Sequence, residues 1–185
     1  MTASTQPIIT STTGRPFACS PAAVLVFIVN RREQFLLLRH PHRDGWEIVN
    51  GALDAAETVL DGGLREVAEE AGPAVRVRPL GAVQIQTFHY DEQVQYMLSL
   101  SLLMAYEGGP IEPGDDMADS EVRWFTLAEL MDENTKVLVP PQDHMRWTFP
   151  RALELYRLWQ DQDVPLQPPL RQRPATKYAR QHHRH

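Results

Sequence analysis

Hydrophobic positions in the first fifty residues come in short continuous runs that are separated by polar turns. Residues 22–29 (AAVLVFIV) are apolar without interruption, and a run of this length is typical of a strand buried on both faces. A polar turn at 30–33 leads to a second apolar run at 34–39 (QFLLLR), so the two runs predict a β-hairpin. After a polar loop, residues 46–49 predict a short third strand.

The second half of the chain adds further strands and two helices. Apolar or alternating segments predict strands at 75–80, 83–88, 95–106 and 121–125. A short helix is expected from Thr126, and a longer one from about Pro150 to Gln160. Strands before, between and after the helices indicate an α/β fold, in which helices pack on a mixed sheet.

The strongest helix prediction covers residues 58–71. Thr58 and Asp61 have the spacing of a capping box, while Gly72 and Pro73 stand where such a helix should end. At about 100° per residue, one face of this helix is apolar; its members are Leu60, Leu64, Val67, Ala68 and Ala71. The opposite face is acidic, and its members are Glu66, Glu69 and Glu70.

The acidic face is unfavourable for the isolated helix. Like charges at these spacings repel each other, and the dipole disfavours anions near the C-terminal end. A divalent cation would offset the repulsion, because Mg²⁺ prefers hard oxygen ligands; a solvated acidic surface is the other interpretation. Gly62 and Gly63 project toward the acidic side, where a ligand could approach, unless the helix begins only near Gly63.

Composition and charge limit the number of domains and the kinds of partner. The 185 residues, 43% of them hydrophobic, suffice for one domain with a core. We place it at 21–162, between a flexible leader at 1–20 and a basic tail at 163–185 that is rich in Pro, Arg and His and expected to be disordered. The formal net charge is −6, and because residues 164–185 hold five basic and no acidic side chains, residues 1–163 carry −11. This acidic body argues against a general nucleic-acid-binding surface.

Cysteine content and hydropathy bear on the compartment. Cys19 is the only cysteine, which excludes an intramolecular disulfide and a thiolate zinc site within one chain. No run of 18 apolar residues occurs, so no membrane span is predicted. A cytoplasmic protein is therefore expected.

The residues around the strongest helix form a motif. Gly51 is followed after five residues by Glu57, and after seven more by Arg65 and Glu66; the segment then closes as Val-Ala-Glu-Glu-Ala-Gly at 67–72. This order resembles the signature box of the Nudix hydrolase superfamily, the MutT-like pyrophosphohydrolases, and all seven fixed residues stand at the family's spacing. At background frequencies, seven such matches at one start point have odds on the order of 10⁻⁸.

The resemblance covers about residues 20–160 and implies the Nudix-type α/β/α sandwich, a mixed β-sheet packed between helices. Three positions depart from the family's pattern. Pro73 replaces the closing aliphatic residue, Val49-Asn50 stands where many members have Pro-Gly, and Ala56 stands where Gly often precedes the first Glu. None of these departures removes a charged group, so they concern the geometry of the loop that enters the box.

The resemblance also implies an activity, the hydrolysis of a pyrophosphate bond in a nucleoside diphosphate linked to another moiety, with Mg²⁺ or its substitute Mn²⁺. Metals that bridge pyrophosphate oxygens stabilise the transition state and lower the pKa of a bound water. The implied metal site consists of the carbonyl of Gly51 and the carboxylates of Glu57, Glu66, Glu69 and Glu70. Arg65 would hold a glutamate in position by ion pairing, with Glu66 and Glu69 as catalytic groups beside it.

Four further residues are candidates for the reaction or the substrate. Glu112 lies in the loop before the last predicted strand, and Glu121 lies at the start of that strand. Both are candidates for the general base or for contacts with substrate; acidic loop surface is the alternative. Arg39 resembles the family arginine that often contacts a phosphate. Tyr90 stands 17 residues beyond the box, where a tyrosine is associated with dinucleoside polyphosphate hydrolysis.

Several alternatives stay open. The substrate could be a dinucleoside polyphosphate, a nucleotide sugar such as ADP-ribose, or a nucleoside triphosphate. A catalytically silent Nudix-fold nucleotide-binding or regulatory module is the second hypothesis; such modules tend to lose box carboxylates, which are all present here. The isoprenoid isomerase branch is disfavoured, because its catalytic cysteine has no counterpart but Cys19, which precedes the first strand. A small nucleotide is the expected partner, no membrane or nucleic acid is expected, and a homodimer is left open.

Overall fold

The computed structural model describes residues 8–162, without the side chains of residues 142–146. Its strands are β1 (Ile8–Thr10), β2 (Pro16–Ala18), β3 (Ala22–Val29), β4 (Phe35–Arg39), β5 (Trp46–Glu47), β6 (Val49–Ala52), β7 (Arg76–Phe88), β8 (Met97–Gly108), β9 (Glu121–Phe125) and β10 (Val137–Val139). Its helical segments are α1 (Val59–Glu66), the π-helical turn η1 (Val67–Ala71), the 3₁₀ turn η2 (Asp115–Met117), α2 (Leu127–Leu130) and α3 (Gln142–Trp159).

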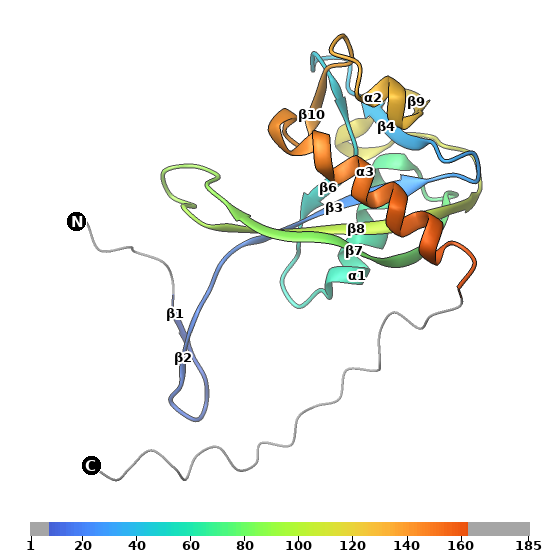
Figure 1. Ribbon diagram of the computed structural model, residues 1–185. Coiled ribbons are helices and arrows are strands. Elements are labelled where there is room, and N and C mark those ends of the chain that lie inside the picture. Colours follow the sequence, from blue (N-terminus) through green and yellow to red (C-terminus); the bar gives the residue numbers. More distant parts are fainter. Residues whose placement is uncertain (1–7, 163–185) are drawn as a thin grey trace.

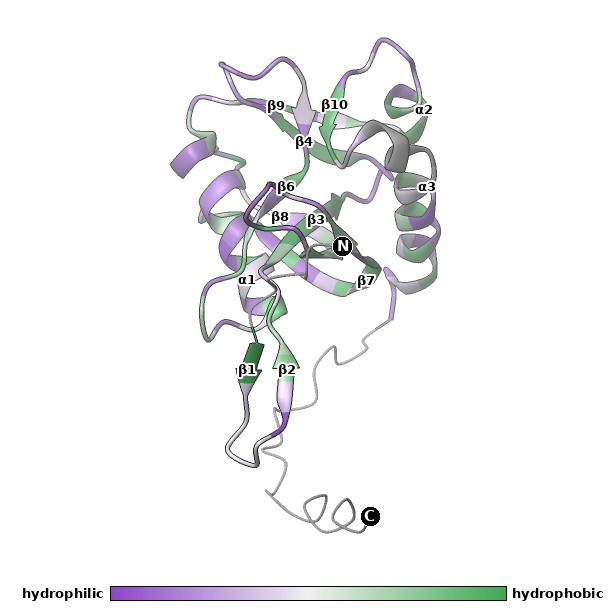
Figure 2. Ribbon diagram, turned by 90° about the vertical axis from the view of Figure 1, so that its left-hand side faces the viewer, coloured by the Kyte–Doolittle hydropathy of each residue, from purple (hydrophilic) through white to green (hydrophobic). Residues whose placement is uncertain are grey.

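The central layer is a mixed sheet with β3 in its middle (Figure 1). β3 runs parallel to β8 and antiparallel to β4 and β6, while β7 pairs antiparallel with β8. Helices α1 and α3 lie on opposite sides of these strands, as the turned view also shows (Figure 2). The predicted α/β/α sandwich with a mixed sheet is therefore confirmed.

Two apolar clusters fill the spaces between the sheet and its helices. Phe27 of β3 joins the cluster on the α3 side, where its ring packs edge-on against Phe149 with centroids 5.2 Å apart. Its neighbours Val26 and Ile28 point the other way, into the cluster that includes Val67 from the start of η1. β3 is apolar at every position because both of its faces are covered.

The structure differs from the predicted elements at three places. The strands expected at 75–80 and 83–88 form one strand, β7, because shifts of register around Gly81 absorb the irregularity. α3 begins at Gln142 and contains Pro150 in its interior, whereas the sequence analysis placed the helix start at that proline. β10, a three-residue strand that pairs with β5, was not predicted at all.

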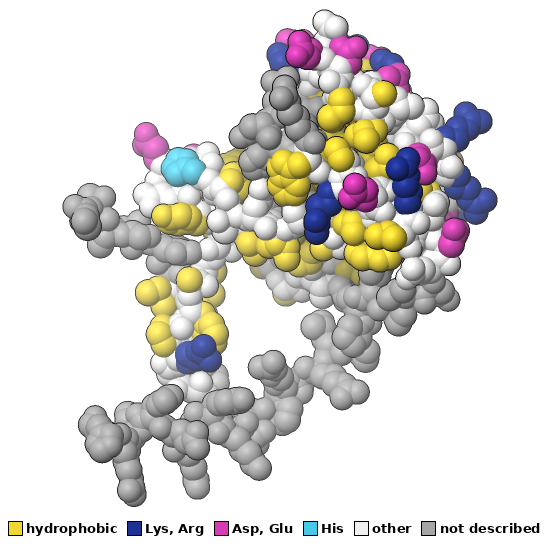
Figure 3. Space-filling model, viewed as in Figure 1, with side chains coloured by type: hydrophobic (Ala, Val, Ile, Leu, Met, Phe, Trp, Pro, Cys, Tyr) yellow, Lys and Arg dark blue, Asp and Glu magenta, His cyan; other side chains and the backbone are white. Residues whose placement is uncertain are grey.

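Part of the expected leader has regular structure. β1 and β2 form an antiparallel hairpin that projects from the body of the molecule (Figure 1). The hairpin exposes Ile8, Ile9 and Phe17 (Figure 3). Regular backbone pairing thus lies within the segment expected to be a flexible leader, whose flexibility stays a prediction; the tail at 163–185 lies outside the described residues. Among the described helices, none combines the length and the apolar character needed to cross a membrane.

Candidate active site

Two glycines let α1 lie close to the sheet. A Cβ atom on Gly63 would lie 2.6 Å from Cδ1 of Leu102 in β8, and one on Gly62 would lie 2.3 Å from Cδ2 of Leu53. Both glycines are buried inside the helix, which begins at Val59. They therefore serve helix packing, and the two interpretations offered by the sequence, an open side for a ligand and a late helix start, are wrong.

The close packing changes which face of the helix is buried. Val67 and Ala71 lie in the core as predicted, but Leu64 and Ala68 are exposed. The helix contacts the sheet through its glycines rather than through Leu64, and the π-helical turn at 67–71 rotates the following residues away from the regular helical period. The buried positions beside the glycines are instead acidic, and they are Glu66 and Glu70.

Arg65 joins three of the four glutamates of the box. Its Nε donates to Oε1 of Glu57 at 2.9 Å, and its Nη1 donates to Oε1 of Glu66 at 2.8 Å and to Oε2 of Glu69 at 2.7 Å. Its Nη2 also donates to the carbonyl of Ala52 in β6, at 2.9 Å. The hydrogen bond from Arg65 lowers the pKa of Glu57 below its ordinary value. One guanidinium therefore fixes α1 to the loop and strand before it.

Glu66 and Glu70 are buried carboxylates with raised pKa values. Glu70 is only 3% exposed and Glu66 only 7%. Burial raises the pKa of Glu70 to about 8 and raises that of Glu66 above its ordinary value, although Arg65 partly opposes the second shift. The backbone N–H of Asn50 donates to Oε2 of Glu70 at 2.8 Å. Burial therefore disfavours the charged forms of both carboxyl groups, and a cation beside them would favour their ionisation.

The donor set fits a hard divalent cation. Oε1 of Glu66 lies 2.1 Å from the point where a Cβ atom of Gly51 would stand, and Oε2 of Glu70 accepts from the backbone of Asn50. Two buried carboxylates and the backbone of Gly51 therefore meet at the junction of β6 and α1. Mg²⁺ commonly takes one or two carboxylates and completes its shell with water and phosphate oxygens. Among the side chains that the structure describes, no three His, Cys, Asp or Glu groups surround one metal position, and Arg65 binds Glu57 and Glu69.

The positions that depart from the Nudix pattern have definite geometries. Ala56 has a φ of +68°, a left-handed conformation that glycine adopts more easily. Gly72, just before Pro73, has a φ of +118°, and a Cβ there would lie 2.7 Å from the carbonyl oxygen of Glu112. The loop after β8 therefore rests on the end of the box.

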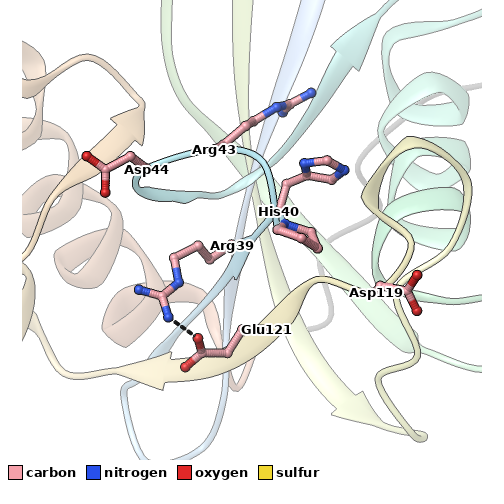
Figure 4. A pocket seen from close by; sticks show the side chains of 7 residues that line it. Arg39, His40, Arg43, Asp44, Asp119 and Glu121 are labelled. Atoms are coloured by element: carbon pink, nitrogen blue, oxygen red, sulfur yellow. Dashed lines mark hydrogen bonds and ion pairs between the residues drawn. The ribbon is translucent and has the colours of Figure 1, made fainter.

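A pocket of about 310 Å³ lies between the ends of β4 and β9. It is lined by Arg39, His40, Pro41, Arg43, Asp44, Asp119 and Glu121. Arg39 and Glu121 are register partners on the two strands, and their side chains point toward one another and form an ion pair (Figure 4). The structure thus brings two of the predicted residues together, in a pocket of mixed charge.

Three residues that the sequence analysis did not single out connect this pocket with the glutamates. Arg43 lines the pocket, and its Nη1 donates to Oε2 of the buried Glu47 at 2.9 Å. Its Nη2 lies 4.0 Å from Oδ2 of Asp116, whose charge raises the pKa of both Glu66 and Glu70. Glu47 stands between the apolar Trp46 and Ile48 in the sequence, and this position could have singled it out. Nothing in the sequence distinguishes Asp116 from the other acids of its loop.

Two predicted residues lie apart from this arrangement. Tyr90 is 63% exposed and stands in the connection between β7 and β8, where its ring contacts Phe88. Figure 1 shows that this connection lies far from the ends of β4 and β9. Glu112 docks on the end of the box through its backbone N–H, which donates to the carbonyl of Ala71 at 2.9 Å, and its side chain is exposed.

Comparison with known proteins decides the family. Residues 20–148 match the NUDIX domain. The chain belongs to the NUDIX domain family. The resemblance seen in the signature box is thereby confirmed, and the box of this Nudix domain comprises the end of β6, the loop at 53–58, α1 and η1.

The relatives of this Nudix domain carry names of several hydrolases. A protein of Vibrio parahaemolyticus named NAD-capped RNA hydrolase NudC is 30% identical over 112 residues, which are 57% of this chain and 39% of that protein. An ADP-ribose pyrophosphatase of Methanocaldococcus jannaschii is 24% identical over 69% of this chain and 75% of its own. This chain therefore spans about two-fifths of the length of the first relative.

A solved structure agrees with the fold. The ADP-ribose pyrophosphatase of Streptococcus suis superposes with a TM-score of 0.58 at 22% identity, over 75% of this chain and 93% of that chain. At this identity the similarity shows the Nudix fold, and it carries no conclusion about substrate.

Proposed function

We propose that this protein hydrolyses a pyrophosphate bond in a nucleoside diphosphate that is linked to another moiety, in a reaction that depends on a divalent metal. The observation that carries the proposal is the buried pair Glu66 and Glu70 beside Gly51, with Arg65 placed to order the neighbouring carboxylates. Buried carboxylates with raised pKa values are typical of functional sites.

The residues of the box would have two roles, as metal ligands and as groups that position those ligands. Glu66, Glu70 and the carbonyl of Gly51 would hold Mg²⁺ or Mn²⁺, and Glu69, half-exposed on the same helix, would join them. The metal, when bound, would polarise phosphoryl oxygens and supply an acidic water. Arg65 keeps the glutamates oriented, and Glu57 anchors Arg65 from the loop.

The pocket at β4 and β9 would bind the charged part of the substrate. Arg39 can exchange its partner Glu121 for a phosphate, because both side chains of this ion pair are about half exposed. Asp116 is the leading candidate for the general base, because its charge interacts with Glu66 and Glu70. Glu121, once released by Arg39, is the other candidate. Glu112 and Tyr90 are weaker candidates for substrate contacts, because neither side chain lines this pocket.

A panel of substrates tests the proposal. The purified protein is incubated with Mg²⁺ or Mn²⁺ and ADP-ribose, diadenosine tetraphosphate, NAD and nucleoside triphosphates, and products are separated by ion-exchange chromatography. We expect cleavage of at least one compound and its loss in Glu66→Gln and Glu70→Gln. Absence of any product from the parent protein with both metals would overturn the proposal.

The catalytically silent module remains the competing function. It would bind nucleotides with equal affinity in the parent and in Glu69→Gln, without turnover in either. Retention of all four glutamates, three of them bonded to Arg65, favours the hydrolase. A cytoplasmic location and a homodimer stay predictions.

A further inference from the structure

Glu47 is a buried carboxylate that the proposed reaction does not use. It stands on β5 and is only 4% exposed. A buried carboxylate is costly unless a charged partner accompanies it. Nη1 of Arg43 donates to Oε2 of Glu47 at 2.9 Å and forms an ion pair with it. Glu47 therefore anchors one nitrogen of the Arg43 guanidinium, in the loop between β4 and β5.

The guanidinium of Arg43 also contacts the turn η2. Its Nη2 lies 4.0 Å from Oδ2 of Asp116, and its Nη1 lies 3.9 Å from Sδ of Met117. The hydrogen bond to Glu47 raises the pKa of Arg43, and the charge of Asp116 adds to this shift. The Arg43 side chain points away from the ion pair at the ends of β4 and β9 (Figure 4). Arg43 thus joins β5 to η2.

The loop that contains η2 is docked on the end of the box. The backbone N–H of Glu112 donates to the carbonyl of Ala71 at 2.9 Å, and a Cβ on Gly114 would lie 3.0 Å from the carbonyl oxygen of Glu69. Met117 is buried in the apolar cluster that also contains Ala71. The box therefore supports η2 from one side, and Arg43 contacts it from another.

The backbone around Asp116 adopts an unfavourable conformation. Asp115 has a φ of +48° and Asp119 a φ of +62°, both in the left-handed region that costs free energy in residues with a Cβ. Such conformations persist only where surrounding contacts hold them. The contacts of η2 with the box and with Arg43 supply that support.

The charge of Asp116 acts on the buried glutamates. Burial is the main cause of the raised pKa values of Glu66 and Glu70, and the negative charge of Asp116 adds to both shifts. A general base must lie within hydrogen-bond reach of the proton that it accepts, directly or through one water. The direction of the Asp116 carboxylate therefore matters for the proposed reaction.

The pair of Arg43 with Asp116 bears on orientation more than on stability. At 4.0 Å, with side chains that are 41% and 66% exposed, such an ion pair adds little to the free energy of unfolding. A guanidinium holds its donors in a fixed fork, so that one arginine meets Glu47 and Asp116 together. A lysine ammonium is a single point charge at the end of a flexible chain and would not hold both.

We propose that Arg43, anchored by the buried Glu47, is a positioning residue that holds η2 and directs the carboxylate of Asp116 toward the glutamates of the box. The inference rests on the proposed function for the reaction that Asp116 serves, and it adds the pair of residues that orients this acid. Arg43 acts through Asp116 and is not itself a catalytic residue.

The first measurement needs neither metal nor activity. The backbone N–H groups of Met117 and Ser120 donate to carbonyls within this loop, so their hydrogen exchange, followed by NMR in the metal-free protein, reports how firmly η2 is held. The test variant combines Arg43→Met with Glu47→Gln, which removes both charges and leaves no unpaired carboxylate buried. Arg157→Met is the matched control, because Arg157 is an exposed arginine of α3 that pairs with Glu33.

We expect the two amides to exchange about tenfold faster in the double variant than in the parent, and at the parent's rate in Arg157→Met. Thermal unfolding of each variant shows whether the whole fold has changed. Unchanged exchange at Met117 and Ser120 in a folded double variant would overturn the inference.

The second measurement is a double-mutant cycle in steady-state kinetics. It compares the parent, Arg43→Lys, Asp116→Asn and the combination of the two, on a compound of the panel that the parent cleaves. Arg43→Lys keeps a positive charge for Glu47 but lacks the second nitrogen. We expect it to lower kcat about tenfold at unchanged KM, and to have no further effect in the Asp116→Asn background.

Two kinetic results would overturn the inference. A raised KM at unchanged kcat in Arg43→Lys would make Arg43 a contact of the substrate. An equal fall of kcat with and without the Asp116 carboxylate would show that Arg43 does not act through Asp116.

Failure of this inference is distinguishable from failure of the proposed function. If the parent cleaves no compound of the panel, the hydrolase is overturned, and the exchange rates still decide whether Arg43 holds η2. If the parent is active but exchange is unchanged or the cycle is additive, the hydrolase stands and the role of Arg43 falls.

Discussion

The carboxylate of Glu66 occupies the space that a side chain at Gly51 would need. A Cβ atom on Gly51 would lie 2.1 Å from Oε1 of Glu66, a distance at which one of the two must move. Gly51 belongs to β6 and Glu66 to the end of α1, so this contact fixes the separation of the strand and the helix. The first and the fourth fixed positions of the box, Gly51 and Glu66, are therefore constrained by packing as well as by chemistry.

Gly51→Ala should displace the Glu66 carboxylate and weaken the proposed metal site. We expect a loss of about 1–3 kcal/mol in the free energy of unfolding, because the new methyl group overpacks the junction. Mn²⁺ affinity should fall at least tenfold, which corresponds to about 1.4 kcal/mol. Urea unfolding and a Mn²⁺ titration followed by electron paramagnetic resonance measure the two effects.

Gly63→Ala provides the comparison. Its Cβ would meet Cδ1 of Leu102 and Cε of Met104, which are ends of flexible side chains, and alanine gains about 1 kcal/mol of helix propensity over glycine. Because overpacking at 2.6 Å costs about 1–3 kcal/mol, which offsets or exceeds that gain, this variant should be no more stable than the parent, and it should keep its Mn²⁺ affinity. An equal loss of affinity in both variants would contradict the role assigned to the contact of Gly51 with Glu66.

Glu70→Gln should stabilise the metal-free protein at high pH. Burial raises the folded-state pKa of Glu70 to about 8, above its ordinary value of 4.5, so the folded state holds a proton that the unfolded state has released. Burial of Glu70 therefore does not lower the free energy of unfolding below pH 4.5. The destabilisation grows as the pH rises and is complete above pH 8. We expect Glu70→Gln to gain about 2–5 kcal/mol at pH 9.

The pH series of urea unfolding in the presence of a chelator measures this gain. At pH 4 the variant and the parent should have the same stability. Adding Mg²⁺ should stabilise the parent more than Glu70→Gln, because only the parent offers a carboxylate there. If the variant were less stable than the parent at pH 9 without metal, ionised Glu70 would not destabilise the folded state.

Arg39→Ala should affect the substrate rather than the fold. The ion pair of Arg39 with Glu121 is about half exposed on both sides, and such pairs contribute only about 0.2–1 kcal/mol. Loss of a phosphate contact should raise KM about tenfold, the equivalent of one charge-assisted hydrogen bond. Steady-state kinetics and thermal unfolding decide the matter, and an unchanged KM would remove Arg39 from the substrate site.

Asp116→Asn and Glu121→Gln distinguish the two candidates for the general base. Asp116 interacts electrostatically with Glu66 and Glu70, whereas Glu121 is held by Arg39. We therefore expect Asp116→Asn to lower kcat by about 100-fold, the lower end of what general bases contribute, and Glu121→Gln to lower it less. The opposite order of kcat values would assign the base to Glu121.

Ala56→Gly should stabilise the protein slightly. Ala56 adopts a left-handed backbone conformation, which costs a residue with a Cβ about 1–2 kcal/mol. Glycine removes this strain but loses about 0.5–1 kcal/mol of chain entropy, so a net gain of about 0.5–1 kcal/mol is expected. Urea unfolding measures it, with Ala55→Gly, which has no positive φ to relieve, expected to be neutral or destabilising.

The sequence alone determined the elements whose signals are local. The apolar run at 22–29 became β3 with the same bounds, and the segment 121–125 became β9, because runs of this kind are buried wherever a sheet is covered. The motif from Gly51 to Gly72 identified the family and the candidate residues, since its spacing is fixed by one loop and one helix.

Only the tertiary structure decided which side of α1 is buried and what meets it. A regular helical wheel placed Leu64 in the core. In the structure Gly63 packs against β8 and Leu64 is exposed, while Glu66, and Glu70 in the π-helical turn, are buried. Likewise, no local pattern brings Arg39 to Glu121, or the Asn50 backbone to Glu70. The first contact depends on the pairing of β4 with β9, and the second on how the end of the box packs against the sheet, and both are properties of the whole fold.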